Sequence, residues 1–78
     1  MRENNELIRL QEVKYVSPKI SNGLQILMVI SGVVTVETNE RYYYLEKTDL
    51  LVINYNQLYE IKGSAENRII VVNIHNKY

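Results

Sequence analysis

The chain has no cysteine, phenylalanine or tryptophan, and only one proline, one histidine and three glycines among its 78 residues. Without cysteine no disulfide can form, and nothing in the composition points to an oxidising compartment. A chain of this length buries only ~60% of the surface that its unfolded form exposes. We therefore expect one domain of marginal stability, which a partner subunit or a neighbouring domain would stabilise further.

The chain also lacks an excess of either charge. Lys plus Arg and Asp plus Glu both number nine, so the formal net charge is zero. Nucleic-acid binding depends on cationic side chains that displace counterions from phosphates, and here the basic residues are scattered singly along the chain. We expect that these 78 residues do not themselves bind DNA or RNA.

Long apolar runs and targeting signals are missing as well. The longest uninterrupted apolar run extends from Ile26 to Ile30, far below the ~20 residues that a membrane span needs. The first six residues are polar and include two acids, which is unlike a secretory signal. The sequence therefore predicts a cytoplasmic protein without membrane contact.

What the chain does contain is a succession of short apolar strands separated by turn residues. Two strand-like stretches at 7–10 and 13–16 come first and end at Ser17-Pro18, because proline lacks the donor that a central strand needs. Further strands are predicted at 25–30, 50–53, 58–62 and 68–74. Turn signals recur every eight to twelve residues from Gly23 onward, which favours an all-β sandwich or barrel.

The centre of the chain predicts a β-hairpin with a two-residue turn at Asn39-Glu40. In that register one face is apolar and the other more polar, as in a half-buried antiparallel pair. The apolar face pairs Val34 with Leu45 and Val36 with Tyr43, and the other pairs Thr35 with Tyr44 and Glu37 with Tyr42. The next strand, 50–53, is apolar at every position, so we predict that it is buried on both faces.

This order of parts resembles the core of the cupin family. The resemblance covers residues 20–75 and is carried by Gly32-x-Val34-x-Val36, Asn39-Glu40, Tyr43-x-Leu45-x-x-x-Asp49-Leu50-Leu51-Val52-Ile53-Asn54 and Asn56-x-x-Tyr59-x-Ile61. More narrowly, the pattern is similar to the N-terminal effector-binding and dimerisation domain of AraC-type transcriptional regulators. It implies a small antiparallel β-barrel of jelly-roll type, whole or incomplete. Gly32 would allow a tight approach between strands, and Asp49 would close the turn before the next strand.

The resemblance also implies a division of the chain. Residues 1–18 would form an N-terminal segment with one or two edge strands, 19–75 the barrel and 76–78 a tail. The DNA-binding region of such a regulator, with its helix-turn-helix units, would lie beyond the end of these 78 residues.

Cupin enzymes resemble one another in having a metal site formed by histidines and a carboxylate. Counting from Gly32 and along the second motif, the corresponding positions here fall near Lys19, Ser21, Gln25 and Tyr59, none of which is a usual ligand in that setting. The only histidine is His75, and no serine lies in a nucleophile-elbow pattern. We therefore expect no metal, no cofactor, no catalytic residues and no enzymatic activity.

Seven tyrosines without other aromatic residues are the most unusual feature of the composition. Tyrosine combines an apolar ring with a hydroxyl that needs a partner when buried. We predict that Tyr59 and Tyr43 bind a small polar effector such as a sugar at the barrel mouth, with Met28 and Val36 in the pocket wall. Tyr42 and Tyr44, on the other face, are predicted at a subunit interface. Simple cross-strand packing is the alternative for all of them.

Together these features suggest a metal-free sensing and dimerising barrel of a bacterial AraC-type regulator. A small-molecule effector would bind in the barrel of a homodimer and control an attached helix-turn-helix region. Two alternatives stay open: a free-standing small cupin with enzymatic activity, and a cupin that serves purely as an assembly module.

Overall fold

The computed structural model describes residues 6–39 and 41–74, which form eight β-strands. The strands are β1 (Glu6–Gln11), β2 (Tyr15–Ile20), β3 (Leu24–Ser31), β4 (Val34–Thr38), β5 (Tyr42–Leu45), β6 (Leu50–Ile53), β7 (Leu58–Gly63) and β8 (Arg68–Ile74). The prediction of an all-β fold is confirmed. Within the described ranges no helix is long and apolar enough to cross a membrane.

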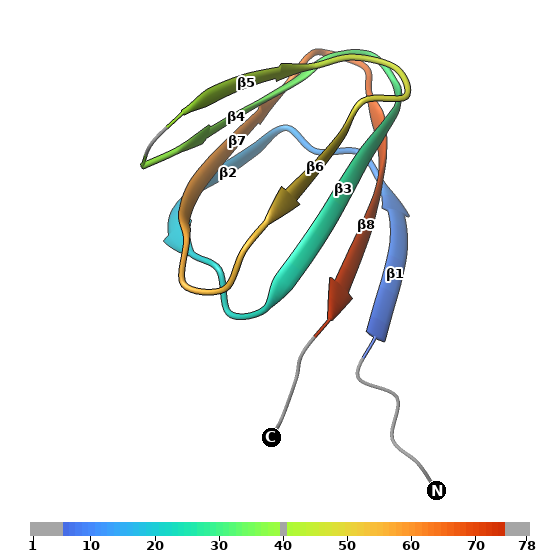
Figure 1. Cartoon of the computed structure of the whole chain (residues 1–78). Coiled ribbons are helices and arrows are strands. Elements are labelled where there is room, and N and C mark those ends of the chain that lie inside the picture. Colours follow the sequence, from blue (N-terminus) through green and yellow to red (C-terminus); the bar gives the residue numbers. More distant parts are fainter. Residues whose placement is uncertain (1–5, 40, 75–78) are drawn as a thin grey trace, which may run out of the picture.

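The strands form two antiparallel sheets of four strands each. The first sheet has the order β1-β8-β3-β6 and the second the order β2-β7-β4-β5. Figure 1 shows the first sheet on the right of the view and the second sheet on the left. Apart from the β4–β5 hairpin, consecutive strands lie in different sheets, which is the jelly-roll arrangement. No pairing between strands of the two sheets closes them into a ring over the described residues, so the molecule is an open jelly-roll sandwich.

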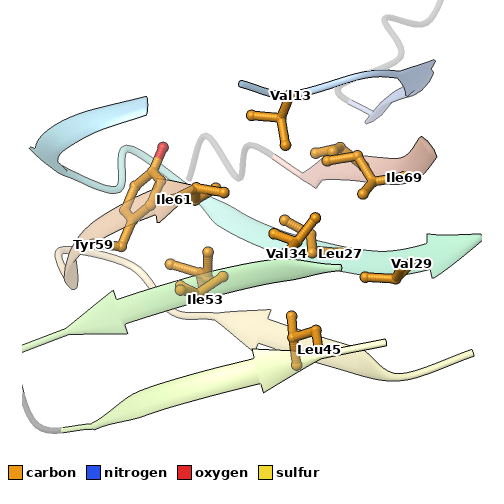
Figure 2. Packing of buried hydrophobic residues seen from close by; sticks show 11 residues of the cluster. Val13, Leu27, Val29, Val34, Leu45, Ile53, Tyr59, Ile61 and Ile69 are labelled. Atoms are coloured by element: carbon orange, nitrogen blue, oxygen red, sulfur yellow. The ribbon is translucent and has the colours of Figure 1, made fainter. Parts of the chain in front are cut away.

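The core lies between the facing sheets and is built by side chains that point inward from both (Figure 2). Its members are Val13, Leu27, Val29, Val34, Val36, Leu45, Ile53, Tyr59, Ile61, Ile69 and Val71, all buried. Side chains alternate along a strand, so β3, β4, β7 and β8 each contribute two residues at a spacing of two, while β5 and β6 contribute one each and Val13 comes from the connection between β1 and β2.

The predicted central hairpin is confirmed. Strands β4 and β5 pair Val34 with Leu45 and Val36 with Tyr43, in the register expected from a two-residue turn. The Thr38 N–H donates to the Arg41 carbonyl at 2.8 Å, next to the turn. Glu40 itself lies outside the described residues. Turn length thus fixed which face of the hairpin is buried.

The prediction that residues 50–53 are buried on both faces is wrong. Strand β6 lies at the edge of the first sheet, and only Ile53 is buried within the chain. On the outward face Leu50 is 56% exposed and Val52 is 42% exposed. No described segment covers the outer face of this sheet. The two apolar side chains of β6 that point outward therefore stay accessible to solvent.

The turn before β6 forms as the sequence indicates. The Asp49 carboxylate accepts a hydrogen bond from the Glu46 N–H at 2.9 Å, and the Asp49 N–H donates to the Glu46 carbonyl at 2.9 Å. Thr48, inside this turn, has a φ of 72°. The side chain of Asp49 therefore closes the turn.

Ser17-Pro18 does not end a strand but interrupts the pairing within one. Strand β2 continues through both residues, and its register with β7 shifts between Val16 and Lys19. Because β2 is an edge strand, a proline and a bulge are tolerated there. The strand also runs across residue 18, where the sequence suggested a boundary between an N-terminal segment and the barrel.

Candidate functional site

The candidate site is a hollow that enters the sandwich between the two sheets. An inner cavity of about 190 Å³ has an apolar wall. That wall is formed by Val13, Val16, Leu27, Ile61, Ile69 and Val71. A wider outer hollow of about 420 Å³ shares five residues with the inner one, so the two form one continuous pocket. We call these five shared residues the mouth ring: Arg9, Lys19, Gln25, Tyr59 and Asn73.

Lys19 reaches the mouth ring because of the bulge in β2. On one side of the bulge Val16 pairs with Ile61, and on the other Lys19 pairs with Tyr59, so one extra residue has been inserted. A shift of one residue turns a side chain to the opposite face of a strand. Lys19 therefore shares the inward face with Val16 and Tyr59, and the bulge between them directs its side chain toward the pocket.

The first sheet supplies the other side of the ring through its register. Arg9 on β1 pairs with the buried Val71 on β8, which places Arg9 on the inward face. Asn73 follows Val71 by two positions on β8, so it lies on the same inward face, and it pairs there with Gln25 on β3. Three strands of one sheet and two strands of the other thus converge on one opening.

A chain of hydrogen bonds links three of the residues at the opening. The Ser21 hydroxyl donates to the Gly23 carbonyl at 2.6 Å, so its oxygen must accept from the Gln25 amide nitrogen at 3.2 Å. The same Gln25 nitrogen donates to the Tyr59 hydroxyl oxygen at 3.1 Å. This order fixes the orientation of the Gln25 amide and makes Tyr59 an acceptor toward Gln25.

Tyr59 is buried, with 4% of its surface exposed, yet its hydroxyl hydrogen meets no acceptor among the described residues. Figure 2 shows the ring beside Ile61, with the hydroxyl directed away from Ile53. A buried phenol normally satisfies its hydroxyl. The free hydrogen can therefore be donated to a molecule in the pocket.

The charge at the opening is of one sign. Arg9 and Lys19 both line it, and no carboxylate of the described residues lines either part of the pocket. Neither cation forms an ion pair with a side chain in the described ranges. The mouth thus combines two unneutralised cations with amide and phenol groups, over an apolar wall.

Of the predicted ligand-binding residues, the structure brings only Tyr59 to this pocket. Val36 is fully buried in the core and Tyr43 packs against that core, and neither lines the hollow. Met28 was expected in the pocket wall, but it lies on the opposite face of β3 from the buried Leu27, paired with Ile70 and Leu50. That expectation is corrected, since alternation along β3 turns Met28 outward.

The predicted interface residues Tyr42 and Tyr44 lie on the outer face of the second sheet. They are 65% and 59% exposed, respectively. Their neighbours there are Thr35 and Glu37 across the hairpin, a mixed polar surface. Their role at a subunit interface stays a prediction.

The residues at the opening do not fit a metal ion of the kind that cupin enzymes hold. The four positions matched to such ligands carry an ammonium group, a hydroxyl, an amide and a phenol. Two of them, Gln25 and Tyr59, are joined by the hydrogen bond from the Gln25 amide nitrogen to the Tyr59 hydroxyl oxygen. No group of three or more His, Cys, Asp or Glu residues gathers anywhere in residues 6–39 and 41–74. His75 lies outside those ranges.

Sequence reasoning missed Arg9 and Asn73 as members of the site. Arg9 alternates with Ile8 and Leu10, and a half-buried strand would normally turn those two apolar residues inward. Here both of them point outward, and Arg9 lies on the inward face at the pocket opening while remaining exposed. The one available signal was the polar Asn73 within the apolar run of β8, opposite Gln25.

Comparison with solved structures identifies the fold. The chain is similar to a cupin superfamily protein of Desulfitobacterium hafniense, with a TM-score of 0.83 and 14% identity over 97% of this chain and 72% of that chain. It is also similar to a cupin-2 domain protein of Shewanella frigidimarina, with a TM-score of 0.82 and 13% identity over 96% and 76%. The EutQ protein of Clostridium difficile matches with a TM-score of 0.71 and 15% identity over 91% and 56%.

The chain therefore has the cupin fold. No model of a protein family matches the sequence, and a search of curated proteins finds no match either. At these identities the likeness concerns the fold, and the pocket of this chain has to be interpreted from its own residues.

Proposed function

We propose that this chain is a metal-free cupin module that binds a small molecule in the pocket between its sheets, rather than an enzyme. One observation carries the proposal: an apolar cavity opens through a ring of polar side chains in which the buried Tyr59 has a free hydroxyl hydrogen. Apolar walls with a few converging polar groups are typical of small-molecule sites. The cavity of about 190 Å³ suits a small metabolite.

We further propose that the module senses its ligand for an attached DNA-binding region, as in AraC-type regulators. The support is the position of two ring residues on the N-terminal edge strands, Arg9 on β1 and Lys19 on β2. A ligand that bridges them to Gln25 and Tyr59 would hold both edge strands against the sandwich. Such a switch requires tighter binding to one arrangement of the strands than to the other.

A ligand screen by thermal shift tests the binding proposal. The panel contains sugars, organic acids, amino acids and divalent metals, and the variants are Tyr59→Phe and the matched Tyr44→Phe. Tyr59→Phe keeps the ring in the core but removes the hydroxyl. We expect a saturable rise in Tm with one compound class that is reduced in Tyr59→Phe and retained in Tyr44→Phe. Stabilisation by a metal alone would contradict a metal-free module.

The regulatory part has a separate test. If the gene continues past Tyr78 into a helix-turn-helix region, we expect the ligand found in the screen to change the DNA affinity of the full-length protein. A gene without such a region, or a DNA affinity that is indifferent to the ligand, would contradict the regulatory proposal and leave the binding proposal standing.

A purely structural role is the second candidate function. The observation that favours it is the apolar outer face of the first sheet, which a single chain leaves accessible at Ile8, Leu10, Leu50 and Val52. An assembly module would show oligomerisation without any ligand-dependent change.

A further inference from the structure

We infer that the ligand of the pocket is a small carboxylate with a short apolar tail. This inference rests on the proposed binding function and names its ligand class. It begins with the hydrogen-bonding capacity of the mouth ring, which offers mainly donors. Arg9 and Lys19 can only donate, and Tyr59 has its acceptor side occupied by Gln25 and its hydrogen free.

A ring of donors and cations selects an anionic acceptor. Arginine binds carboxylates through two parallel N–H groups, and lysine adds a compact positive charge. No acidic side chain of the described residues competes at the opening. A sugar presents hydroxyl groups that donate as well as accept, and it would leave both cations without a counter-charge.

The rest of the ligand follows from the inner cavity. Its wall is apolar behind the ring, apart from Gln11 at the β1 side, and its volume is about 190 Å³. At ~30 Å³ per water molecule in the liquid, this space accommodates a chain of a few carbon atoms. A carboxylate held by Arg9, Lys19 and Tyr59 would thus direct its tail between Leu27 and Ile61.

Isothermal titration of the 78-residue chain with butyrate, valerate and benzoate tests the inference. Butyramide, inorganic phosphate and a pentose serve as comparison probes. We expect the carboxylates to bind, butyramide and phosphate to bind at least ~10-fold more weakly, and affinity to fall with ionic strength. Lys19→Gln and Arg9→Gln should each weaken binding by ~10-fold or more. Lys62→Gln, which removes an exposed lysine on the outer face of the second sheet, should not.

The outcomes separate this inference from the proposed function. Binding of the pentose or butyramide that Tyr59→Phe weakens would overturn the carboxylate assignment while supporting a small-molecule site. Phosphate binding as tightly as valerate would overturn the apolar-tail part. If no probe binds and Tyr59→Phe changes nothing, both proposals fail.

A different observation carries a second proposal, which concerns the outer face of the first sheet. Strand pairing aligns its outward side chains in rows across all four strands. One row is Ile8, Val72, Ile26 and Val52, and the next is Leu10, Ile70, Met28 and Leu50. A third row joins Ile74 to Leu24 and continues on β1 at Glu6, so the apolar part of this row is only two residues long. We call the ten apolar residues of these rows the apolar face. They include no charged or hydrogen-bonding side chain.

The strand sequences distinguish this sheet from the other one. Antiparallel strands with one solvated face alternate between apolar and polar residues, as β4 does, whereas strands covered on both faces are apolar throughout. Strands β3, β6 and β8 of the first sheet contain continuous apolar runs. Their composition is that of strands covered on both sides, but the described chain covers only one side.

We propose that a second copy of this chain covers the apolar face. Four strands at ~4.8 Å spacing and three rows at ~6.8 Å give a patch of roughly 19 by 20 Å. This is about half of the ~800 Å² per partner in a standard interface, so it would form the apolar centre with the surrounding residues as its rim. Because these ten side chains carry no charge and Glu6 stands at the edge of the patch, two identical copies can meet through the apolar centre across a two-fold axis without repulsion there.

Sedimentation velocity over a concentration series tests this proposal with charge-introducing variants. We expect wild-type protein at twice the chain mass of 9.2 kDa. Leu50→Lys should shift the dissociation constant upward by at least ~10-fold. The matched variant Tyr44→Lys changes a side chain of similar exposure, 59% against 56%, on the other sheet and should remain dimeric.

Leu10→Lys changes a residue that is 60% exposed at the opposite edge of the same row. It is a second test variant, so that a folding defect in one variant does not decide the result. Circular dichroism verifies that each variant is folded. A monomeric wild-type protein throughout the series would overturn the proposal, as would two folded lysine variants that both stay dimeric. Dissociation by Tyr44→Lys alone would place the interface at the predicted tyrosines instead.

Discussion

Gly32 occupies a backbone conformation that only glycine adopts easily. Its φ is 78°, and a Cβ atom there would collide with the Glu66 carbonyl and with Asn67. We predict that Gly32→Ala lowers the free energy of unfolding by about 2–3 kcal/mol, because left-handed strain and a backbone collision add together. Urea denaturation measures the loss. The neighbouring Ser31→Ala, at an exposed position, is the control, and an equal effect of both variants would contradict the explanation.

Tyr15, on the outer face of the second sheet, should make the stability of the folded chain depend on pH. Its hydroxyl donates to the Glu60 carboxylate at 2.7 Å, and this hydrogen bond raises the pKa of Tyr15 above its usual value. The folded state therefore favours the neutral phenol. The resulting stabilisation is present below the unfolded pKa of ~10 and is lost as the pH rises through the higher folded pKa.

We accordingly expect Tyr15→Phe to be slightly less stable than the wild type at neutral pH. The difference should vanish at a pH above the raised pKa. Urea denaturation at both pH values measures it, with Tyr44→Phe as a control because the Tyr44 hydroxyl forms no hydrogen bond to a described residue. A difference that persists unchanged at alkaline pH would show that the hydroxyl–carboxylate bond is not its source.

At the scale of the elements, Asn67 joins segments that are far apart in the sequence. It is buried between the connection of β1 to β2 and the loop before β8. Its side-chain oxygen accepts from the Val13 N–H at 3.0 Å, and its nitrogen donates to the carbonyls of Val13 at 2.7 Å and Ser64 at 2.9 Å. The two edge strands that carry Arg9 and Lys19 are therefore fixed by one amide.

We predict that Asn67→Ala costs about 3 kcal/mol of stability, since it leaves buried backbone groups of Val13 without partners. Asn67→Asp should cost at least as much, because it places an acceptor against two carbonyl oxygens. Thermal and urea unfolding measure both, and the exposed Asn54→Ala is the control. A loss below ~1 kcal/mol in Asn67→Ala would mean that water replaces the amide there.

The strand pattern shows why the bounds and register of the strands could be predicted better than which of their faces is buried. Strand β8 has the predicted bounds, and the hairpin has the predicted register, because turn residues and alternation are local signals. The burial of β6 was predicted incorrectly and the role of Arg9 was missed. Strand β6 is apolar on both faces, so alternation does not show which face is inward, whereas in β1 alternation indicates the wrong face because the apolar Ile8 and Leu10 lie outward.

At the scale of the whole molecule, the proposed dimer makes stability depend on concentration. Binding between folded chains shifts the unfolding equilibrium by mass action. We predict that the Tm of the wild-type chain rises by several degrees over a 100-fold increase in concentration, and that the Tm of Leu50→Lys stays constant. Differential scanning calorimetry at several concentrations measures both. A wild-type Tm that does not change with concentration would contradict the dimer.

By itself the sequence determined the all-β class, most of the strands, the hairpin register and the unsuitability of the pocket positions for metal ligands. These follow from residue type and short-range spacing. The tertiary structure alone decided that a bulge at Ser17-Pro18 turns Lys19 inward, that Arg9 lines the same pocket as Tyr59, and that Met28 belongs to the apolar face. These results depend on pairings between residues far apart in the chain, and a single inserted residue is enough to reverse the face on which a side chain lies.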